Sequence, residues 1–98
     1  MEVVFRDSSL DRLEVDTQFD AGLPRAVVKM FRKRIQYIRA ADDERSFYAM
    51  RSLRFEKLRG DRKGQYSMRL NDQWRLILEL QKSGKQTVAE LVSVEDYH

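Results

Sequence analysis

The sequence contains no cysteine and a single histidine among its 98 residues. Without cysteine, the chain can form neither a disulfide framework nor a thiolate zinc site. A small domain without such cross-links is typical of the reducing cytoplasm. The start of the sequence lacks the apolar run of a signal peptide, and no stretch approaches the roughly 18 apolar residues of a membrane span. We therefore expect a soluble, cytoplasmic protein with no membrane partner.

The length and composition predict one folded domain over residues 1–98. A chain of this size buries about 60–65% of the surface that its unfolded form exposes. Hydrophobic residues make up 42% of the sequence, which is enough for one core, and charged residues make up 36%. This composition favours a folded domain with a strongly charged surface over a disordered chain.

Acidic and basic residues are segregated along the chain, although the net charge is only +3. Residues 1–20 contain six acidic and two basic side chains, whereas residues 21–41 contain six basic side chains and no acidic one. Residues 51–75 contain eight basic and three acidic side chains. A basic face is the electrostatic footprint of a protein that binds a polyanion. The alternative interpretation is an ordinary solvated surface.

The first half of the sequence predicts one strand and two helices. Residues 2–6 alternate as in a short strand, and residues 9–15 favour a short helix capped by Ser8 or Ser9. Pro24 is a helix-start signal for the longest helix, expected over residues 24–41. Its apolar stripe has three- and four-residue spacing and consists of Val27, Met30, Phe31, Ile35 and Ile38. A connection over 42–52 follows, which we expect Phe47, Tyr48 and Met50 to anchor to the core.

The second half changes to the two-residue period of strands. Alternating apolar residues predict strands near 53–58, 66–70, 74–80 and 88–94. Turn signals separate them at Gly60 to Gly64, at Asn71-Asp72 and at Ser83-Gly84. The predicted fold class is α+β: an N-terminal strand, two helices, then a largely antiparallel sheet of about four strands, with the helices on one face.

Few kinds of active site are compatible with these residues. One histidine and no cysteine leave only carboxylates for a metal site, and no pair of them has ligand spacing. Gly60 and Gly64 lack the Lys-Ser/Thr that follows the glycines of a phosphate-binding loop. No nucleophile-elbow pattern appears, although one sequence does not exclude a Ser–His–Asp triad. His98 is the last residue, and terminal residues are usually inert, but it directly follows Asp96-Tyr97 after a β-rich run.

Metal-independent RNA cleavage requires only groups that this sequence supplies. A base removes the proton of the ribose 2′-hydroxyl, an acid protonates the departing 5′-oxygen, and cations stabilise the phosphoryl oxygens. One or two proton-transfer groups and nearby arginine or lysine therefore suffice.

Four motifs carry a resemblance to a known family. Residues 58–64 are LRGDRKG, residues 66–69 are YSMR, residues 71–75 are NDQWR and residues 95–98 are EDYH. In combination they resemble the HigB toxins, also called plasmid-maintenance killer proteins, of the RelE superfamily. The resemblance covers residues 53–98 in motif and the whole chain in length and element order. It implies a compact RelE-like microbial ribonuclease fold.

The resemblance also implies a function. HigB-type toxins belong to type II toxin–antitoxin systems and are ribosome-dependent endoribonucleases, or mRNA interferases. They cleave translated mRNA in the decoding site by acid–base chemistry, without a metal or an organic cofactor. The implied partners are therefore the ribosome, mRNA and a HigA-type helix-turn-helix antitoxin, through which alone the toxin would reach operator DNA.

The same resemblance assigns catalytic roles to residues near the end of the chain. It implies proton transfer by His98, positioning of the RNA or contact with a base by Tyr97, and orientation of a neighbour by Asp96. Arg75, after the expected core residue Trp74, matches a family position near the scissile phosphate.

Glu56 departs from the pattern of some relatives, which carry histidine two residues before the leucine of the LRGD motif. A glutamate could act as general base if burial raised its pKa. It could equally be a surface acid paired with Arg54 or Arg75. The sequence leaves open which residue is the base and which the acid.

Several basic residues are candidates for contact with RNA or the ribosome. Their backbone contacts would give affinity without sequence choice. The candidates are Arg59, Arg62, Lys63, Arg69, Arg32 and Lys33. We expect Asp61 to close the turn between the two glycines.

Two other functions are compatible with the sequence. The first is a non-catalytic RNA- or ribosome-binding module, a degenerate toxin, which Glu56 in place of histidine keeps open. The second is a protein that acts mainly as the antitoxin's partner in autoregulation. Binding to ribosomes without cleavage products would favour the first.

Overall fold

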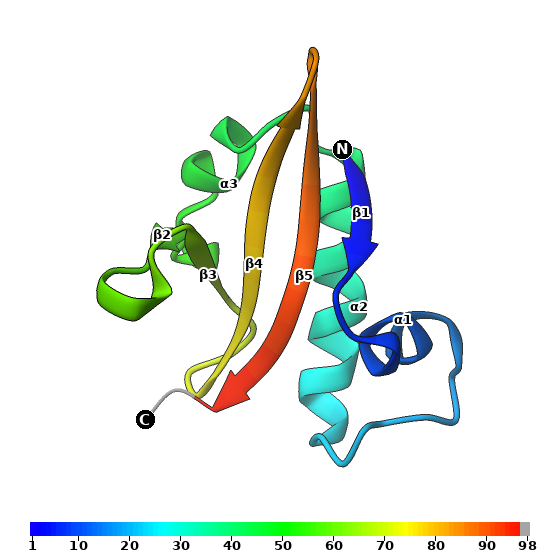
Figure 1. The fold of residues 1–98 in the computed structure, drawn as a ribbon. Helices are drawn as coiled ribbons and strands as arrows, with labels where there is room; N and C mark the ends of the chain where they lie inside the picture. Colours follow the sequence, from blue (N-terminus) through cyan, green and yellow to red (C-terminus); the bar gives the residue numbers. More distant parts are fainter. Residues whose placement is uncertain (97–98) are drawn as a thin grey trace.

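The computed structural model describes residues 1–96 and contains one five-stranded sheet of order β1-β5-β4-β3-β2 (Figure 1). The strands are β1 Glu2–Phe5, β2 Glu56–Lys57, β3 Gln65–Arg69, β4 Trp74–Ser83 and β5 Gln86–Asp96. Neighbouring strands are antiparallel except β1, which pairs in parallel with β5. The predicted α+β class with a largely antiparallel sheet is confirmed.

In the described part of the chain, three helices and two 3-10 turns connect and cover the strands. They are α1 Ser8–Val15, α2 Arg25–Ala40, α3 Arg45–Ala49, η1 Arg51–Leu53 and η2 Gly60–Arg62. The cap of α1 is Asp7, whose carboxylate accepts a hydrogen bond from the Ser9 amide at 2.8 Å, so the predicted serine cap is wrong. Pro24 occupies the N-cap position of α2, so the helix begins one residue later than predicted. Within residues 1–96, no helix combines the length and the apolar character required to cross a membrane.

The hydrophobic core lies between α2 and one face of the sheet. The predicted stripe on α2 supplies Val27, Phe31, Ile35 and Ile38, all at most 1% exposed. Leu76 and Leu78 of β4 and Leu91 of β5 pack against the stripe from the sheet. In Figure 1, α2 runs behind β5 and β1, so the view looks onto the opposite face of the sheet.

Two details of the middle segment differ from prediction. The strand expected over 53–58 is reduced to two residues, because Leu53 belongs to η1 and Arg54 adopts the left-handed region at φ 46°. An extended strand cannot continue through that conformation. Of the three expected anchors only Phe47 is buried, whereas Tyr48 is 52% and Met50 37% exposed.

Candidate functional site

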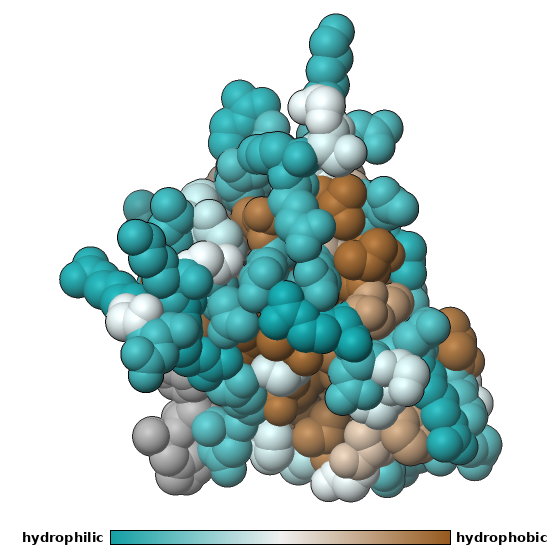
Figure 2. Space-filling view, viewed as in Figure 1, coloured by the Kyte–Doolittle hydropathy of each residue, from teal (hydrophilic) through white to brown (hydrophobic). Residues whose placement is uncertain are grey.

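The face of the sheet turned away from α2, which we call the open face, carries the polar residues of the strands. Cross-strand partners share a face of a sheet. The pairing places Arg69, Arg75 and Glu95 in one row across β3, β4 and β5. The next row contains Ser67, Ile77 and Ser93, with Glu56 of β2 opposite Ser67. Figure 2 shows this side of the molecule, where hydrophilic side chains cover most of the strands.

A bidentate ion pair between Arg62 and Glu95 crosses the open face. The two guanidinium nitrogens lie 2.6 and 2.7 Å from the two carboxylate oxygens. Arg62 Nε also donates to Gln65 Oε1 at 3.1 Å, and Ser93 Oγ donates to Glu95 at 2.6 Å. Arg62 holds the pKa of Glu95 below its ordinary value, so this carboxylate is charged at neutral pH.

This ion pair ties the η2 turn across the open face. Arg62 belongs to the connection between β2 and β3, whereas Glu95 is on β5, so the side chains reach across β3 and β4. The path from Gln65 to Glu95 crosses the row that contains Ile77, which is fully buried although it points away from the core. We infer that the Arg62 guanidinium covers Ile77. An RNA phosphate that approached Arg62 would have to compete with Glu95.

Arg75 lies at the centre of the charged row. It is half-buried, with Arg69 as its cross-strand partner on β3 and Glu95 on β5. The Arg69 guanidinium forms a salt bridge with Asp72, and the Arg69 carbonyl accepts a hydrogen bond from Arg34 Nε at 3.1 Å. Burial and the charge of Arg69 lower the pKa of Arg34. Several guanidinium groups at one end of the sheet make a site that favours an anion such as a phosphate.

Polar contacts continue from this site to the edge strand β1. Gln65 Nε2 donates to Glu79 at 3.2 Å, and Glu79 forms a salt bridge of 3.0 Å with Arg6. Arg6 in turn pairs with Glu90 at 2.9 Å. Glu79, Glu90 and Glu95 are thus each paired with an arginine. The pairing fixes the orientation of these long side chains on the open face.

Glu56 is exposed on β2 at the margin of the open face. Its carboxylate takes part in none of the salt bridges among residues 1–96, so the predicted pairing with Arg54 or Arg75 is absent there. Its cross-strand neighbour Ser67 is 1% exposed. The chain alone does not provide the burial that the general-base hypothesis requires.

Asp96 is the last residue of β5 and lies opposite Trp74. It is exposed and accepts a hydrogen bond from Gln73 Nε2 at 2.9 Å. Trp74 is half-buried against the core, in line with its predicted structural role. Tyr97 and His98 lie outside the described residues, so their catalytic roles stay predictions.

The structure separates the predicted RNA-binding residues into two groups. Arg59 and Lys63 are exposed beside η2, and Arg69 lies on the open face. Arg32 and Lys33 belong to α2, on the other side of the sheet.

Arg32 makes hydrogen bonds within the chain. Its Nε donates to the carbonyl of Leu13 at 3.0 Å, and its Nη2 donates to the carbonyls of Asp16 and Phe19 at 3.0 and 3.5 Å. These acceptors lie at the end of α1 and in the loop that follows. Arg32 therefore joins α2 to α1, whereas Lys33 is exposed. The RNA contacts of both residues stay predictions.

Glu95 was not predicted from the sequence as a site residue, and Tyr48 was predicted only as an anchor to the core. Glu95 belongs to the EDYH motif, but only the register of β4 and β5 places it beside Arg75.

Within residues 1–96, no cluster of three or more metal-ligating side chains is present.

Comparison with known proteins identifies relatives of this architecture. Residues 3–98 match a family model described as the RelE-like toxin of the type II toxin–antitoxin system HigB. The fold is similar to the YoeB/ParE toxin from Agrobacterium tumefaciens, with a TM-score of 0.65 and 21% identity over 100% of both chains. It is also similar to a chain of the YoeB-YefM complex from Staphylococcus aureus, with a TM-score of 0.59, 19% identity and coverage of 100% of this chain and 97% of that one.

A third similar structure is the toxin–antitoxin complex RelBE2 from Mycobacterium tuberculosis, with a TM-score of 0.50 and 18% identity over 99% of this chain and 96% of that one. No match was found among curated proteins. At these identities the solved structures show a common fold, and the family match extends the likeness to the sequence.

Proposed function

The chain belongs to the family of HigB-like, RelE-like toxins of type II toxin–antitoxin systems, and from this premise we propose that it is a ribosome-dependent endoribonuclease. Its substrate would be mRNA in the decoding site of a translating ribosome. The observation that supports this proposal best is the row of Arg69, Arg75 and Glu95 on the open face. The row thus contains two cations, and its residue Glu95 directly precedes in sequence the segment Asp96-Tyr97-His98, where we propose a group for proton transfer.

The proposed reaction is an internal attack within the RNA. The 2′-oxygen of a ribose forms a bond to the adjacent phosphorus, and the bond from phosphorus to the 5′-oxygen of the next nucleotide breaks. A general base takes the 2′-hydroxyl proton, and a general acid gives a proton to the departing 5′-oxygen. The products are a 2′,3′-cyclic phosphate and a free 5′-hydroxyl. Proton-transfer groups and cations of the chain suffice for these steps.

Arg75 is our candidate for the cation that stabilises the phosphoryl oxygens. Its half-buried position reduces screening by water, and Arg69 beside it adds positive charge. The ion pair of Arg62 with Glu95 would hold the turn and the end of β5 in place around the phosphate.

Glu56 and His98 are the candidates for proton transfer. Glu56 is exposed in the chain alone, so bound RNA and the ribosome would have to remove water from its carboxylate before it could act as a base. By the family resemblance, His98 transfers a proton, Tyr97 positions the RNA and Asp96 orients a neighbour. The pH–rate profiles of a Glu56→Gln and a His98→Ala variant would show which of the two residues acts as the base and which as the acid.

The proposed partner in the cell is a HigA-type antitoxin with a helix-turn-helix domain. Two of the similar solved structures are toxin–antitoxin complexes, which supports an antitoxin partner for this fold. The toxin would act in the cytoplasm, where ribosomes and mRNA are found, and would reach operator DNA only through the antitoxin.

Primer extension on an mRNA in a reconstituted translation reaction tests the proposal. We expect cuts within codons that require ribosomes and that disappear with His98→Ala. Arg75→Gln should slow cleavage by about 10²–10³-fold, the usual loss when one transition-state donor is removed. Arg25→Gln is the matched control, because Arg25 is an exposed arginine on α2, on the other side of the sheet.

The main alternative is a non-catalytic module that binds ribosomes or RNA, or a degenerate toxin that acts in antitoxin-linked autoregulation. The exposed Glu56 in place of histidine favours this alternative. Ribosome binding by the wild-type chain without any cut in the mRNA would establish it. Cleavage that persists in folded His98→Ala would instead leave the enzyme in place and remove His98 from its mechanism.

A further inference from the structure

A groove of about 1030 Å³ lies along the β2 edge of the sheet, beside the open face. It is lined by aromatic and basic side chains from α3, β2, β3 and the turn between the two strands. The aromatic residues of the groove are Tyr48, Phe55 and Tyr66, and its basic residues include Lys57, Arg59 and Lys63. Glu56 lines the same groove and also stands opposite Ser67 at the margin of the open face. The groove therefore meets the open face at Glu56, one of the proposed proton-transfer residues.

Tyr48 presents an aromatic ring in this groove on a rigid support. Its ring packs edge-on against Phe55 at a centroid distance of 4.9 Å, and Phe55 stacks on Tyr66 at 5.1 Å with 4° between the planes. Phe55 is 8% exposed and also contacts the fully buried Phe47. Tyr48 itself is 52% exposed. A large aromatic ring held open to solvent on a packed base is typical of a binding surface.

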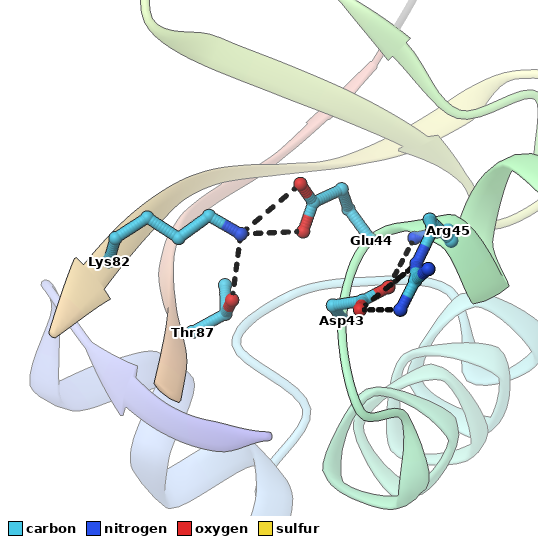
Figure 3. A network of polar contacts seen from close by, with 5 residues as sticks. All are labelled: Asp43, Glu44, Arg45, Lys82 and Thr87. Atoms are coloured by element: carbon cyan, nitrogen blue, oxygen red, sulfur yellow. Dashed lines mark hydrogen bonds and ion pairs between the residues drawn. The ribbon is translucent and has the colours of Figure 1, made fainter. Parts of the chain in front are cut away.

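Two contacts hold α3, the helix that carries Tyr48, in place (Figure 3). Lys82 Nζ at the end of β4 lies 3.1 and 3.2 Å from the carboxylate oxygens of Glu44, the N-cap residue of α3. Asp43 accepts hydrogen bonds from both the amide and the guanidinium of Arg45. The position of the Tyr48 ring is thus set by the strand hairpin as well as by the aromatic contacts.

The cations of the groove differ from Arg62 and Arg69 of the open face, which form salt bridges with Glu95 and Asp72. Lys57, Arg59 and Lys63 are exposed, and within residues 1–96 none of them forms a salt bridge. Among the described residues that line the groove, Glu56 supplies the one carboxylate. Burial raises the pKa of Tyr48, so its phenol adds no negative charge at neutral pH. The groove therefore presents an excess of positive charge around an exposed aromatic ring.

We propose that this groove binds a single-stranded segment of RNA next to the scissile phosphate, with one base stacked on Tyr48 and backbone phosphates on Arg59 and Lys63. Stacking on aromatic rings combined with cations along the backbone is the general mode of single-strand recognition. An acidic peptide would use the cations but would leave the ring without a matching planar group. The inference rests on the proposed function for its choice of RNA as ligand, and it adds a base-binding residue outside the catalytic set.

The test is the affinity for a short, fluorescently labelled RNA with 2′-O-methyl riboses, which cannot be cleaved, measured by fluorescence anisotropy. Stacking of one base contributes about 1–3 kcal/mol, so Tyr48→Ala should weaken binding by about fivefold to 150-fold. Tyr48→Phe should retain the affinity, because it retains the ring. Met50→Ala is the matched control: Met50 is a neighbouring residue, 37% exposed, that does not line the groove.

The cations and the RNA itself provide two further readouts. Arg59→Gln and Lys63→Gln should each reduce the dependence of binding on salt by about one unit of slope. An RNA without bases should bind the wild-type chain about as weakly as the normal RNA binds Tyr48→Ala. The measurement with RNA that lacks bases uses the wild-type chain. It therefore tests whether base stacking contributes to binding even if Tyr48→Ala does not fold.

Equal affinity of the wild-type chain for RNA with and without bases would overturn the inference, even if mRNA cleavage on ribosomes were normal. A Tyr48→Ala variant that loses affinity for the antitoxin but not for RNA would also overturn it and assign the groove to an acidic antitoxin segment. Conversely, Tyr48-dependent RNA binding by a chain that cuts no mRNA would support the groove and contradict the proposed enzyme. The two proposals therefore fail in different experiments.

Discussion

The two faces of the five-stranded sheet differ in what covers them. Toward α2, the strands present leucines that are fully buried against Phe31, Ile35 and Ile38. On the open face, the same strands present glutamates, which form partly exposed ion pairs with Arg6 and Arg62 from the segments beside the strands. Because successive residues of a strand point to opposite faces, neighbouring positions such as Arg75 and Leu76 can serve different purposes.

This difference separates stability from chemistry. Burial of apolar side chains contributes most of the folding free energy, whereas exposed ion pairs contribute about 0–1 kcal/mol each. The ion pairs of the open face can therefore rearrange around a phosphate without unfolding the domain. Substitutions on the helix side should lower stability, and substitutions on the open face should lower RNA cleavage.

The largest effect on stability is expected from Phe31→Ala. Phe31 is fully buried at the centre of the core, and removing such a ring costs about 3–5 kcal/mol of unfolding free energy. Urea denaturation followed by circular dichroism measures the loss. Lys29→Ala, an exposed change on the same helix, should alter the value by less than about 0.5 kcal/mol. A loss below about 1 kcal/mol for Phe31→Ala would contradict the assignment of the core to this face.

Arg32 and Lys33 are adjacent cations that allow a sharper comparison on the helix side. Arg32→Ala removes the donor for three backbone carbonyls of the α1 end and loop, and we expect a loss of about 1–3 kcal/mol. Lys33→Ala removes an exposed charge and should change stability by less than about 0.5 kcal/mol. Equal stabilities in urea would remove the structural role of Arg32. Weaker ribosome binding by Lys33→Ala would identify α2 as a second contact surface.

The same pair illustrates what the sequence could and could not predict. The helical stripe on α2 and the alternation in β3, β4 and β5 are local patterns, so the elements followed from them. Arg32 and Lys33 have the same charge and similar neighbours in sequence, and only the packing of α1 against α2 distinguishes them. Arg54 shortened the predicted strand because its left-handed conformation has no signal in a non-glycine residue.

The candidate site was predictable only in part for a related reason. The motifs that contain Arg75 and Asp96 indicated where the chemistry lies, but the partners across the strands depend on register. The β-bulge between Ile77 and Leu78 shifts the pairing of β4 with β5, so the opposition of Arg75 and Glu95 could not be derived from strand boundaries alone. Likewise, periodicity could not show that Tyr48 is exposed while Phe47 beside it is buried.

Glu95→Gln tests whether the ion pairs of the open face matter for cleavage rather than for folding. The variant weakens the bond to Arg62 and so frees the η2 turn, and we expect cleavage on ribosomes to fall by about tenfold, the equivalent of about 1.4 kcal/mol. Stability should change by less than about 1 kcal/mol, because the two side chains are 38% and 32% exposed.

The matched control for this variant is Glu90→Gln, which weakens the ion pair of Glu90 with Arg6. Glu90 lies on the same strand and the same face as Glu95 but far from Arg75 in the register. Cleavage by Glu90→Gln should equal that of the wild-type chain. If both variants cleave equally well, the contact of Arg62 with Glu95 has no part in positioning the site.

The smallest effect is expected at the opposite end of the molecule, where Asp43 pairs with Arg45 (Figure 3). The hydrogen bonds from the Arg45 side chain lower the pKa of Asp43 from 3.8 to about 2. A carboxyl whose pKa is lower in the folded state stabilises the fold above its unfolded pKa, and this contribution is lost as the pH falls from 3.8 toward 2. Arg45→Gln should therefore move the midpoint of Asp43 titration, followed by NMR of the carboxyl carbon, upward toward 3.8. A wild-type midpoint already near 3.8 would contradict the ion pair. The two proteins should cleave RNA equally at neutral pH, because Asp43 and Arg45 lie outside the strands that form the open face.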